Sequence, residues 1–343
     1  MRQKRAMCSI ILAAGKGTRI GLTSTHKTCL PVGGRPVIVR SIESYRAAGI
    51  SPHVVVVGKG AQHVLKTVGS LFSDVLFAYQ PEPLGTGNAA KCGARLLSSV
   101  SYDGDVLVTA GDKLIEEKVI RKMIRKFHSS GLHCLFLIGS REDSPGSGRV
   151  IFDEKGRPLR IIETADIRRA RVLSQILERA EEGNVYPQFV AKAIAAERMG
   201  DHKDRLAFGQ LCDFASGTVP MSADEVKGLI PKQNISFAVR SGKRAKRLSL
   251  EQADSAEHVN LSVYILRADA LEFAVGKVKA DNAQNEEYLT DIIEILSRAK
   301  KGDRNRFKLG TMSLDDPRNV MTFNNLHELR AIEEYVREKE SRM

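Results

Sequence analysis

The sequence predicts an α/β fold in which helices cover both faces of a mainly parallel β-sheet. Several short apolar runs, rich in β-branched residues, lack polar alternation, as at 53–58 and 105–112. A strand that is apolar on both sides must be covered on both faces, which is typical of parallel sheets. Segments with helical spacing of apolar residues alternate with these runs, as expected when helices connect parallel strands.

The predicted elements follow one another along the whole chain. Apolar runs predict a first strand ending in 10–14, further strands at 53–58, 75–80, 105–112, 134–139 and 260–266, and a hairpin that ends at 163. Amphipathic spacing predicts helices at 34–49, 60–70, 87–99, 116–130, 167–182 and 188–199, a short one from 224, and a last helix after 326. In such folds, ligands bind at the carboxyl ends of the strands.

The composition narrows the class of protein. A chain of 343 residues with 42% hydrophobic and 27% charged residues can bury a large core. No apolar run is long enough to span a membrane, and the charged N-terminus lacks a cleavage site, so we expect a cytoplasmic protein. Five scattered cysteines without paired metal spacing indicate free thiols in a reducing compartment.

The formal net charge of +12 has two interpretations, nucleic-acid binding or the handling of phosphates. Basic residues are spread over the chain, and there is no Trp and little aromatic interleaving to stack bases. We therefore expect no nucleic-acid partner. The densest basic cluster, 243–247, is expected in an exposed loop.

A glycine-containing loop follows the first strand. Gly15 and Gly17 let backbone N–H groups turn toward a ligand. Lys16 and Arg19 add positive charge, and an arginine can bind two phosphate oxygens at once. The loop therefore suits a polyphosphate; a purely structural glycine turn is the alternative.

Lys27 lies eight residues after Arg19, within the segment 26–38. The pattern is not a Rossmann fingerprint, which needs a third glycine where Arg19 stands, nor a Walker A loop, which ends in Gly-Lys-Ser/Thr. The two-part motif resembles the signature of the sugar-nucleotide pyrophosphorylases, a nucleotidyltransferase family. The resemblance implies a Rossmann-like (GT-A-like) mixed sheet. It also implies a nucleoside triphosphate held by the first loop, with Arg19 and Lys27 at its phosphates; the loop residues are Leu12, Ala13, Ala14, Gly15, Gly17 and Thr18.

Gln80 is followed by a turn and the sequence Pro-Leu-Gly-Thr-Gly. A turn before a helix is one interpretation. The segment also resembles the base-reading segment of the uridylyltransferases, which implies that Gln80, Gly85 and Thr86 contact uracil.

Asp112 ends a buried strand, and Ile115 and Glu116 are expected to open the next helix. A carboxylate here caps that helix or binds Mg²⁺. In the resembling family the aspartate of this Gly-Asp pair binds the metal, and the match makes Asn324 the second protein ligand, although Asn324 also suits a helix N-cap region. The resemblance assigns no role to Lys113.

The sugar side is predicted on weaker motifs. The resemblance implies that Gly148 and Glu163 contact an amino-sugar, although Gly-Ser-Gly hairpins are common, and that Asn260 belongs to the sugar-binding strand. In the family that strand follows the glutamate closely, so residues 166–256 are interpreted as a helical insertion in a catalytic domain of 1–165 and 257–343. A peripheral decoration and a lid over the sugar both remain open.

The segment 281–293 looks like the loop and helix typical of N-acetylglucosamine-1-phosphate uridylyltransferases. The hexapeptide repeats of the bifunctional bacterial enzymes do not occur, so acetyl transfer is not expected, and a homo-oligomer is left open. The resemblance implies Mg²⁺-dependent transfer of UMP from UTP to N-acetylglucosamine 1-phosphate. The alternatives are another nucleoside triphosphate or another sugar or alcohol phosphate, and a non-catalytic nucleotide-binding regulatory subunit.

Overall fold

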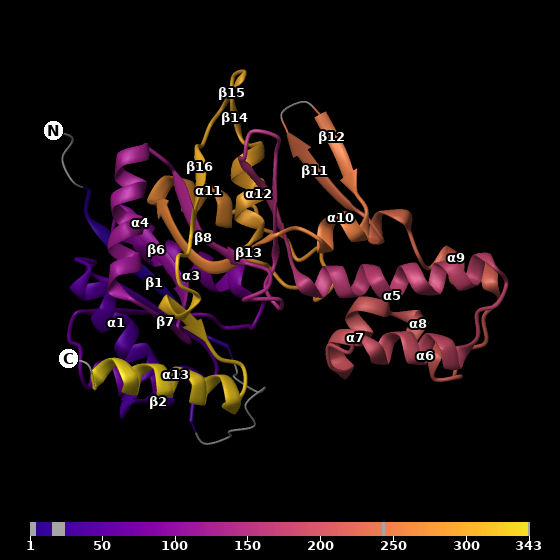
Figure 1. The fold of residues 1–343 in the computed structure, drawn as a ribbon, viewed down its shortest axis with the longest axis horizontal. Coiled ribbons are helices and arrows are strands. Elements are labelled where there is room, and N and C mark those ends of the chain that lie inside the picture. The colour runs from indigo at the N-terminus through magenta and orange to yellow at the C-terminus, as the bar shows by residue number, and fades with distance from the viewer. Residues whose placement is uncertain (1–4, 16–24, 242–243, 342–343) are drawn as a thin grey trace.

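The protein is seen in a computed structural model that describes residues 5–15, 25–241 and 244–341 (Figure 1). Within these residues nine strands form one sheet. β1, β4, β5 and β6 run parallel to one another, β13 runs antiparallel to β6 and β8, and β16 runs parallel to β8. The bounds are β1 (Met7–Ala13), β4 (His53–Val57), β5 (Val75–Tyr79), β6 (Asp105–Ala110), β8 (Cys134–Ser140), β9 (Arg149–Phe152), β10 (Pro158–Ile162), β13 (His258–Arg267) and β16 (Leu309–Ser313). The predicted mainly parallel mixed sheet is confirmed.

Helices cover both faces of this sheet (Figure 1). One face packs on α1 (Val37–Ala47), α2 (Ala61–Gly69) and α4 (Glu117–Ser130). The other face packs on α3 (Thr86–Ser99), α11 (Ala268–Val275) and α12 (Asp291–Arg298). Neighbouring strand residues alternate between the two cores, as Ile10 and Ile11 do, and both are fully buried. Burying one such side chain stabilises the fold by roughly 1.5–3 kcal/mol, which explains the unbroken apolar runs.

The region after β6 differs from the prediction. Lys113–Ile115 forms a short strand, β7, which pairs with β17 (Val320–Thr322). Helix α4 begins at Glu117 with Glu116 as its N-cap, so the expectation that Ile115 also opens the helix was wrong, as was the helix-cap interpretation of Asp112. Asp112 lies in the turn between β6 and β7. The strand depends on a partner about 200 residues away, which a local pattern cannot reveal.

Residues between β10 and β13 form a helical lobe with its own apolar core, which extends to the right in Figure 1. The helices expected at 167–182, at 188–199 and from 224 are present as α5 (Thr164–Glu181), α6 (Pro187–Ala196) and α9 (Ala223–Gly228). The lobe also contains α7 (Asp201–Phe208), α8 (Gln210–Ala215) and α10 (Leu250–Asp254).

The basic cluster 243–247 was wrongly predicted as a loop. From Arg244 onward it belongs to β12 (Arg244–Leu248), which pairs with β11 (Phe237–Ser241). Leu248 is the register partner of Phe237, and both side chains are buried. Leu248 follows the basic run 243–247, so the run by itself contains no large apolar residue that would predict a strand.

A partly buried ion pair between Arg149 and Asp254 attaches the lobe to the sheet. The carboxylate of Asp254 accepts hydrogen bonds from Arg149 of β9 at 2.9 Å and from Arg171 of α5 at 2.7 Å. The Arg149 side chain is only 8% exposed, and hydrogen bonds between two charged groups are stronger than those between neutral ones. The base of the lobe is therefore fixed beside the start of β9.

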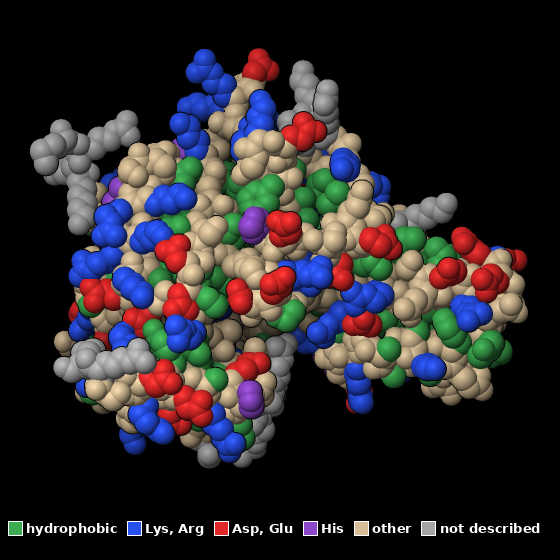
Figure 2. Space-filling model, in the orientation of Figure 1, with side chains coloured by type: hydrophobic (Ala, Val, Ile, Leu, Met, Phe, Trp, Pro, Cys, Tyr) green, Lys and Arg blue, Asp and Glu red, His purple; other side chains and the backbone are tan. Residues whose placement is uncertain are grey.

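Figure 2 shows Lys and Arg side chains distributed among acidic ones over this face of the molecule. A basic group also projects at the top on the hairpin of β14 (Lys300–Lys301) and β15 (Arg304–Asn305). Across the described ranges, no helix is both long enough and apolar enough to cross a bilayer.

Candidate active site

The carboxyl ends of the four parallel strands meet at one edge of the sheet, as predicted. Gly15 follows β1, Gln80 follows β5, and Asp112 follows β6. A cavity of about 230 Å³ opens at this edge; its lining consists of Ala14, Gly58, Lys59, Gln80, Pro81, Glu82 and Pro83. A Cβ at Gly58 would lie 2.9 Å from the carbonyl oxygen of Ala14, so this close approach of the two loops needs a glycine. The sequence analysis missed Gly58 and Lys59, although Gly58 directly follows a buried strand.

The first loop is described only in part. Leu12 and Ala13 belong to β1, and Ala14 and Gly15 follow it. The predicted phosphate-binding residues Gly17, Thr18 and Arg19 lie outside the described residues.

His26 joins the first loop to the segment that carries Lys27. Its Nε2 donates to the carbonyl oxygen of Gly15 at 2.8 Å, and its Nδ1 lies 2.9 Å from Oγ1 of Thr28. A carbonyl only accepts, so Nε2 carries the proton and Nδ1 is the acceptor in the neutral ring. Burial lowers the pKa of His26, which favours this neutral form. The sequence analysis assigned no role to His26.

Three residues predicted from separate motifs come together beside Phe323. The ammonium of Lys27 forms an ion pair with the carboxylate of Asp112 and lies 3.4 Å from Oδ1 of Asn324. It also lies 5.0 Å from the centre of the Phe323 ring, within the range of a cation–π contact. The pairing of β7 with β17 brings Asn324 to Asp112, because Asp112 precedes β7 and Asn324 follows β17.

The oxygens of Asp112 and Asn324 suit a divalent cation. Both are hard oxygen donors, and both contact the same cationic group, the ammonium of Lys27. In the part of the chain that the structure describes, no group of three His, Cys, Asp or Glu could hold a metal ion. A Mg²⁺-like ion at this pair would therefore complete its coordination with phosphate oxygens and water, as such ions usually do.

Lys113, next to this pair, has a buried side chain on β7, and burial lowers its pKa. Its backbone carbonyl accepts from Oγ of Ser41 at 2.7 Å. The structure gives no account of why a lysine stands here.

The three predicted base-reading residues have different surroundings. Gln80 lines the cavity and is 4% exposed. The carbonyl of Gly85 accepts a hydrogen bond from Nε2 of Gln80 at 3.1 Å. Oγ1 of Thr86 accepts from the backbone N–H of Leu289 at 3.0 Å. Of these three residues, Gln80 is the one that lines the cavity, whereas Gly85 and Thr86 make hydrogen bonds within the surrounding structure.

Gly85→Ala is expected to destabilise the fold and to weaken nucleotide binding. Gly85 has a φ of +107°, and an added Cβ would lie 2.6 Å from the carbonyl oxygen of Glu287. Backbone strain together with this clash should cost about 2–3 kcal/mol. Thermal denaturation and the KM for the nucleotide check the prediction. Gly146→Ala is the matched control, because its added Cβ meets no heavy atom within 4 Å. Equal melting temperatures of the two variants would contradict the prediction.

The predicted sugar-side residues also lie together, at the same edge of the sheet on the far side of β13. The backbone N–H of Asn260 donates to the carbonyl of Gly148 at 2.9 Å. A Cβ at Gly148 would lie 3.4 Å from Cδ of Glu163. Glu163 accepts a hydrogen bond from Oγ1 of Thr290 at 2.8 Å, and burial raises the pKa of its carboxyl group. Thr290 is a contact of this cluster that the sequence analysis did not single out.

Burial raises the pKa of nearby Asp291 to about 7. Its folded-state pKa exceeds the unfolded value near 4, so between about pH 4 and pH 7 this carboxyl group binds more protons in the folded state than in the unfolded state. The free energy of unfolding therefore falls as pH rises through this range. Asp291→Asn should remove this loss and be more stable than wild type at pH 8, by up to about 4 kcal/mol. Denaturant unfolding at pH 5 and pH 8 checks it, with exposed Asp303→Asn as control. A variant no more stable than wild type at pH 8 would contradict the expectation.

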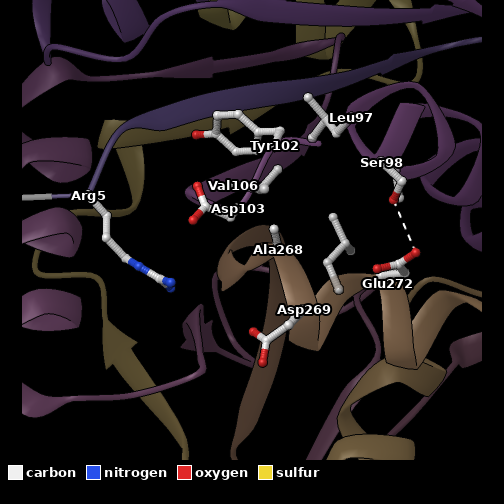
Figure 3. Close-up of a pocket in the computed structure, with 11 residues that line it drawn as sticks. Arg5, Leu97, Ser98, Tyr102, Asp103, Val106, Ala268, Asp269 and Glu272 are labelled. Atoms are coloured by element: carbon white, nitrogen blue, oxygen red, sulfur yellow. Dashed lines mark hydrogen bonds between the residues drawn. The ribbon is translucent and has the colours of Figure 1, made fainter. Parts of the chain in front are cut away.

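A larger cavity, of about 300 Å³, lies at the opposite edge of the sheet, near the start of β6 and the end of β13 (Figure 3). Its lining includes Arg5, Ser98, Asp103, Asp269 and Glu272, and Ser98 donates to Glu272 at 3.1 Å. None of the residues predicted for nucleotide, sugar or metal lines it. Of the predicted residues, Ala14 and Gln80 line the smaller cavity.

Curated relatives match this chain over part of their own length. The bifunctional protein GlmU of Pelobacter propionicus is 40% identical over 161 residues, which are 47% of this chain and 34% of that protein. The bifunctional protein GlmU of Pelotomaculum thermopropionicum is 26% identical over 334 residues, which are 97% of this chain and 52% of that protein. The chain thus spans at most about half the length of these two relatives.

Two solved structures resemble the whole chain. One is a putative glucose-1-phosphate thymidylyltransferase from Bacillus anthracis in complex with a sucrose, with a TM-score of 0.56, 16% identity, and 97% of this chain and 96% of that chain covered. The other is a UDP-glucose pyrophosphorylase complexed with UDP-glucose, with a TM-score of 0.56, 14% identity, and coverage of 98% and 99%. At these identities the likeness shows the shared fold.

A family model, the MobA-like NTP transferase domain, matches residues 9–192, which is more than half of the chain. The match includes the first loop, Lys27, Gln80, Asp112 and Glu163. Together with the relatives, it confirms the predicted resemblance to the sugar-nucleotide pyrophosphorylases. The chain belongs to the family of MobA-like NTP transferase domains and is a nucleotidyltransferase of the sugar-phosphate type.

Proposed function

We propose that the protein transfers UMP from UTP to N-acetylglucosamine 1-phosphate, giving UDP-N-acetylglucosamine and pyrophosphate with the help of Mg²⁺. The observation that carries the proposal is the convergence of Lys27, Asp112 and Asn324 at the strand edge that also holds the nucleotide cavity. The choice of sugar and base rests on the resemblance of Gln80 with its Pro-Leu-Gly-Thr-Gly segment, and of residues 281–293, to the N-acetylglucosamine-1-phosphate uridylyltransferases.

The reaction needs no covalent enzyme intermediate. An oxygen of the sugar phosphate forms a bond to the α-phosphorus, and the bond from that phosphorus to the bridging oxygen breaks, so pyrophosphate leaves with the electron pair. The chain's contribution is positioning and the stabilisation of charge. Lys27, with Arg19, supplies positive charge for the departing pyrophosphate.

Asp112 and Asn324 would hold the metal ion, which when bound neutralises phosphate charge and polarises the α-phosphoryl group. Lys27 contacts both residues, so its ammonium moves from them to the phosphates when the substrates arrive. The triphosphate of UTP would lie along the first loop, from Ala14 to Thr18. The base would enter the cavity beside Gln80.

We place the acceptor sugar beside Gly148, Glu163 and Asn260. We further propose that residues 166–256 are a subdomain inserted in a catalytic domain of 1–165 and 257–343. Two contacts support the proposal that this subdomain lies beside the sugar-binding residues. Asp166 accepts from the backbone N–H of Ala283 at 2.7 Å, and Lys203 of α7 lies 3.3 Å from the carboxylate of Glu286. The lobe therefore touches the loop that precedes Thr290.

The test is release of pyrophosphate with Mg²⁺, UTP and N-acetylglucosamine 1-phosphate. Glucose 1-phosphate as acceptor and ATP, CTP, GTP and dTTP as donors are run beside it. Efficient turnover by the first pair alone would support the whole proposal. Turnover only with another pair would overturn the substrate assignment and leave the reaction type. Absence of release with every pair would overturn the proposal.

A further inference from the structure

A chain of hydrogen bonds runs behind the nucleotide cavity. Nε2 of Gln80 donates to the carbonyl of Gly85 and to Oδ1 of Asn88, both at 3.1 Å. Nδ2 of Asn88 donates to Oε2 of Glu287 at 3.2 Å. Gln80 is 4% exposed, and Asn88 and Glu287 are half-buried. The bonds therefore lie largely out of competition with water, where their direction matters most.

The carboxylate at the end of this series of bonds determines which way the Asn88 amide faces, and together with the carbonyl of Gly85 it determines which way the Gln80 amide faces. A carboxylate without a proton only accepts, so Asn88 must present its NH₂ group to Glu287. The side-chain oxygen of Asn88 then faces Gln80, so Gln80 must donate a hydrogen bond to it from its own NH₂ group. The two hydrogens of that group are both used, one on Asn88 and one on Gly85. Oε1 of Gln80 remains, and it can only accept.

Backbone contacts hold Glu287 in place. Its N–H donates to the carbonyl of Leu84 at 2.7 Å, and its carbonyl accepts from the N–H of Gly87 at 2.6 Å. The ammonium of Lys91 lies 3.9 Å from Oε1 of its side chain. The backbone of Glu287 is therefore hydrogen-bonded to Leu84 and to Gly87, which lie on either side of Gly85.

We propose that Glu287 and Asn88 are positioning residues for base selection, because they fix the amide of Gln80 as a hydrogen-bond acceptor toward the nucleotide. The inference rests on the proposed function, in which Gln80 meets the base. Oε1 of Gln80, as an acceptor, selects a base whose ring nitrogen facing it carries a hydrogen. Uracil has N3–H, whereas N3 of cytosine is itself an acceptor. The arrangement thus favours UTP over CTP, since a mismatched pair leaves two buried acceptors facing each other.

Glu287→Gln tests the inference. A glutamine at 287 can present either its oxygen or its NH₂ group, so Asn88 can reverse and turn its own NH₂ group toward Gln80. The carbonyl of Gly85 is then the one acceptor that still holds the NH₂ group of Gln80, so reversal of Gln80, which offers an N–H to the base, becomes less costly. We expect the ratio of kcat/KM for UTP to that for CTP to fall at least about tenfold, which corresponds to 1.4 kcal/mol. Glu286→Gln is the matched control: the same change one residue earlier, where the carboxylate pairs with Lys203 outside the chain of bonds. Its ratio should stay at the wild-type value.

Two further measurements keep the test independent of folding and of turnover. Wild-type protein should not use N3-methyl-UTP, because the methyl group replaces the hydrogen that Oε1 of Gln80 accepts. Binding of UTP, CTP and N3-methyl-UTP, measured by calorimetry without acceptor, reports base selection even when no sugar phosphate reacts. UTP binding that exceeds CTP binding, without turnover, would overturn the proposed function and support the inference. A UTP/CTP ratio unchanged in Glu287→Gln, or full use of N3-methyl-UTP, would overturn the inference and leave the function in place.

Discussion

Asp112→Asn is expected to lower kcat by about 10³-fold while the fold remains intact. The change keeps the shape of the side chain and removes the negative charge. In the structure that carboxylate holds the ammonium of Lys27, and with Asn324 it provides the oxygens that suit a divalent ion. The neutral variant should also need much more Mg²⁺ to reach half of its maximal rate, since charge is the main attraction between a carboxylate and a hard cation.

Pyrophosphate release at several Mg²⁺ concentrations checks this expectation, with far-UV circular dichroism and thermal denaturation as the test of folding. Asp103→Asn makes the same change at an exposed aspartate on the opposite edge of the sheet, so it controls for a loss of one surface charge. A wild-type rate for Asp112→Asn, at an unchanged Mg²⁺ requirement, would reject the metal site at this pair.

The central sheet could be predicted because its strands carry their own signal. β1, β4 and β6 are apolar on both sides, and this pattern appears only where helices cover both faces of a sheet. Their parallel order then brings Gly15, Gln80 and Asp112 to one edge, which is why three distant motifs could be assigned to one site. The burial of neighbouring residues in two different cores is the physical origin of the pattern.

Contacts between distant segments could not be predicted from local patterns. β7 is a strand because β17 pairs with it, and Asn88 has a defined direction because Glu287, 199 residues away, accepts its hydrogen bond. Neither segment shows a distinctive period of its own. His26 was missed for a related reason, since its importance comes from a bond to Gly15 and not from its place in a motif.

The lobe between β10 and β13 illustrates both situations. Helices α5, α6 and α9 were predicted from their sequence pattern, because each buries apolar residues in a shared core, whereas the short helices α7, α8 and α10 were not predicted. The β11–β12 hairpin was missed, because basic residues dominate β12 and its buried apolar residue, Leu248, stands at its end. The contacts of Asp166 and Lys203 with the loop before Thr290 depend on how the lobe is oriented, which no local pattern contains.

Lys27→Met is expected to lower kcat about 10²-fold or more and, at the same time, to strengthen the binding of a divalent ion. The rate should fall because, in the proposed reaction, the ammonium supplies positive charge where pyrophosphate departs. The affinity for the metal should rise because Lys27 and the ion seek the same two oxygens, those of Asp112 and Asn324. A residue that merely supported the fold would lower both the rate and the affinity.

Calorimetric titration with Mg²⁺ or Mn²⁺ separates these outcomes, and Lys66→Met, at an exposed position on α2, controls for the loss of one positive charge. Loss of the partly buried ion pair should also cost the variant about 2 kcal/mol of stability without bound metal. Adding the ion should restore part of this stability, because it replaces the missing cation beside Asp112. Weaker metal binding by Lys27→Met would contradict the idea that the ammonium and the ion share one position. An opposite movement of rate and affinity would instead identify Lys27 as the cation that holds this site in order until the substrates and the metal arrive.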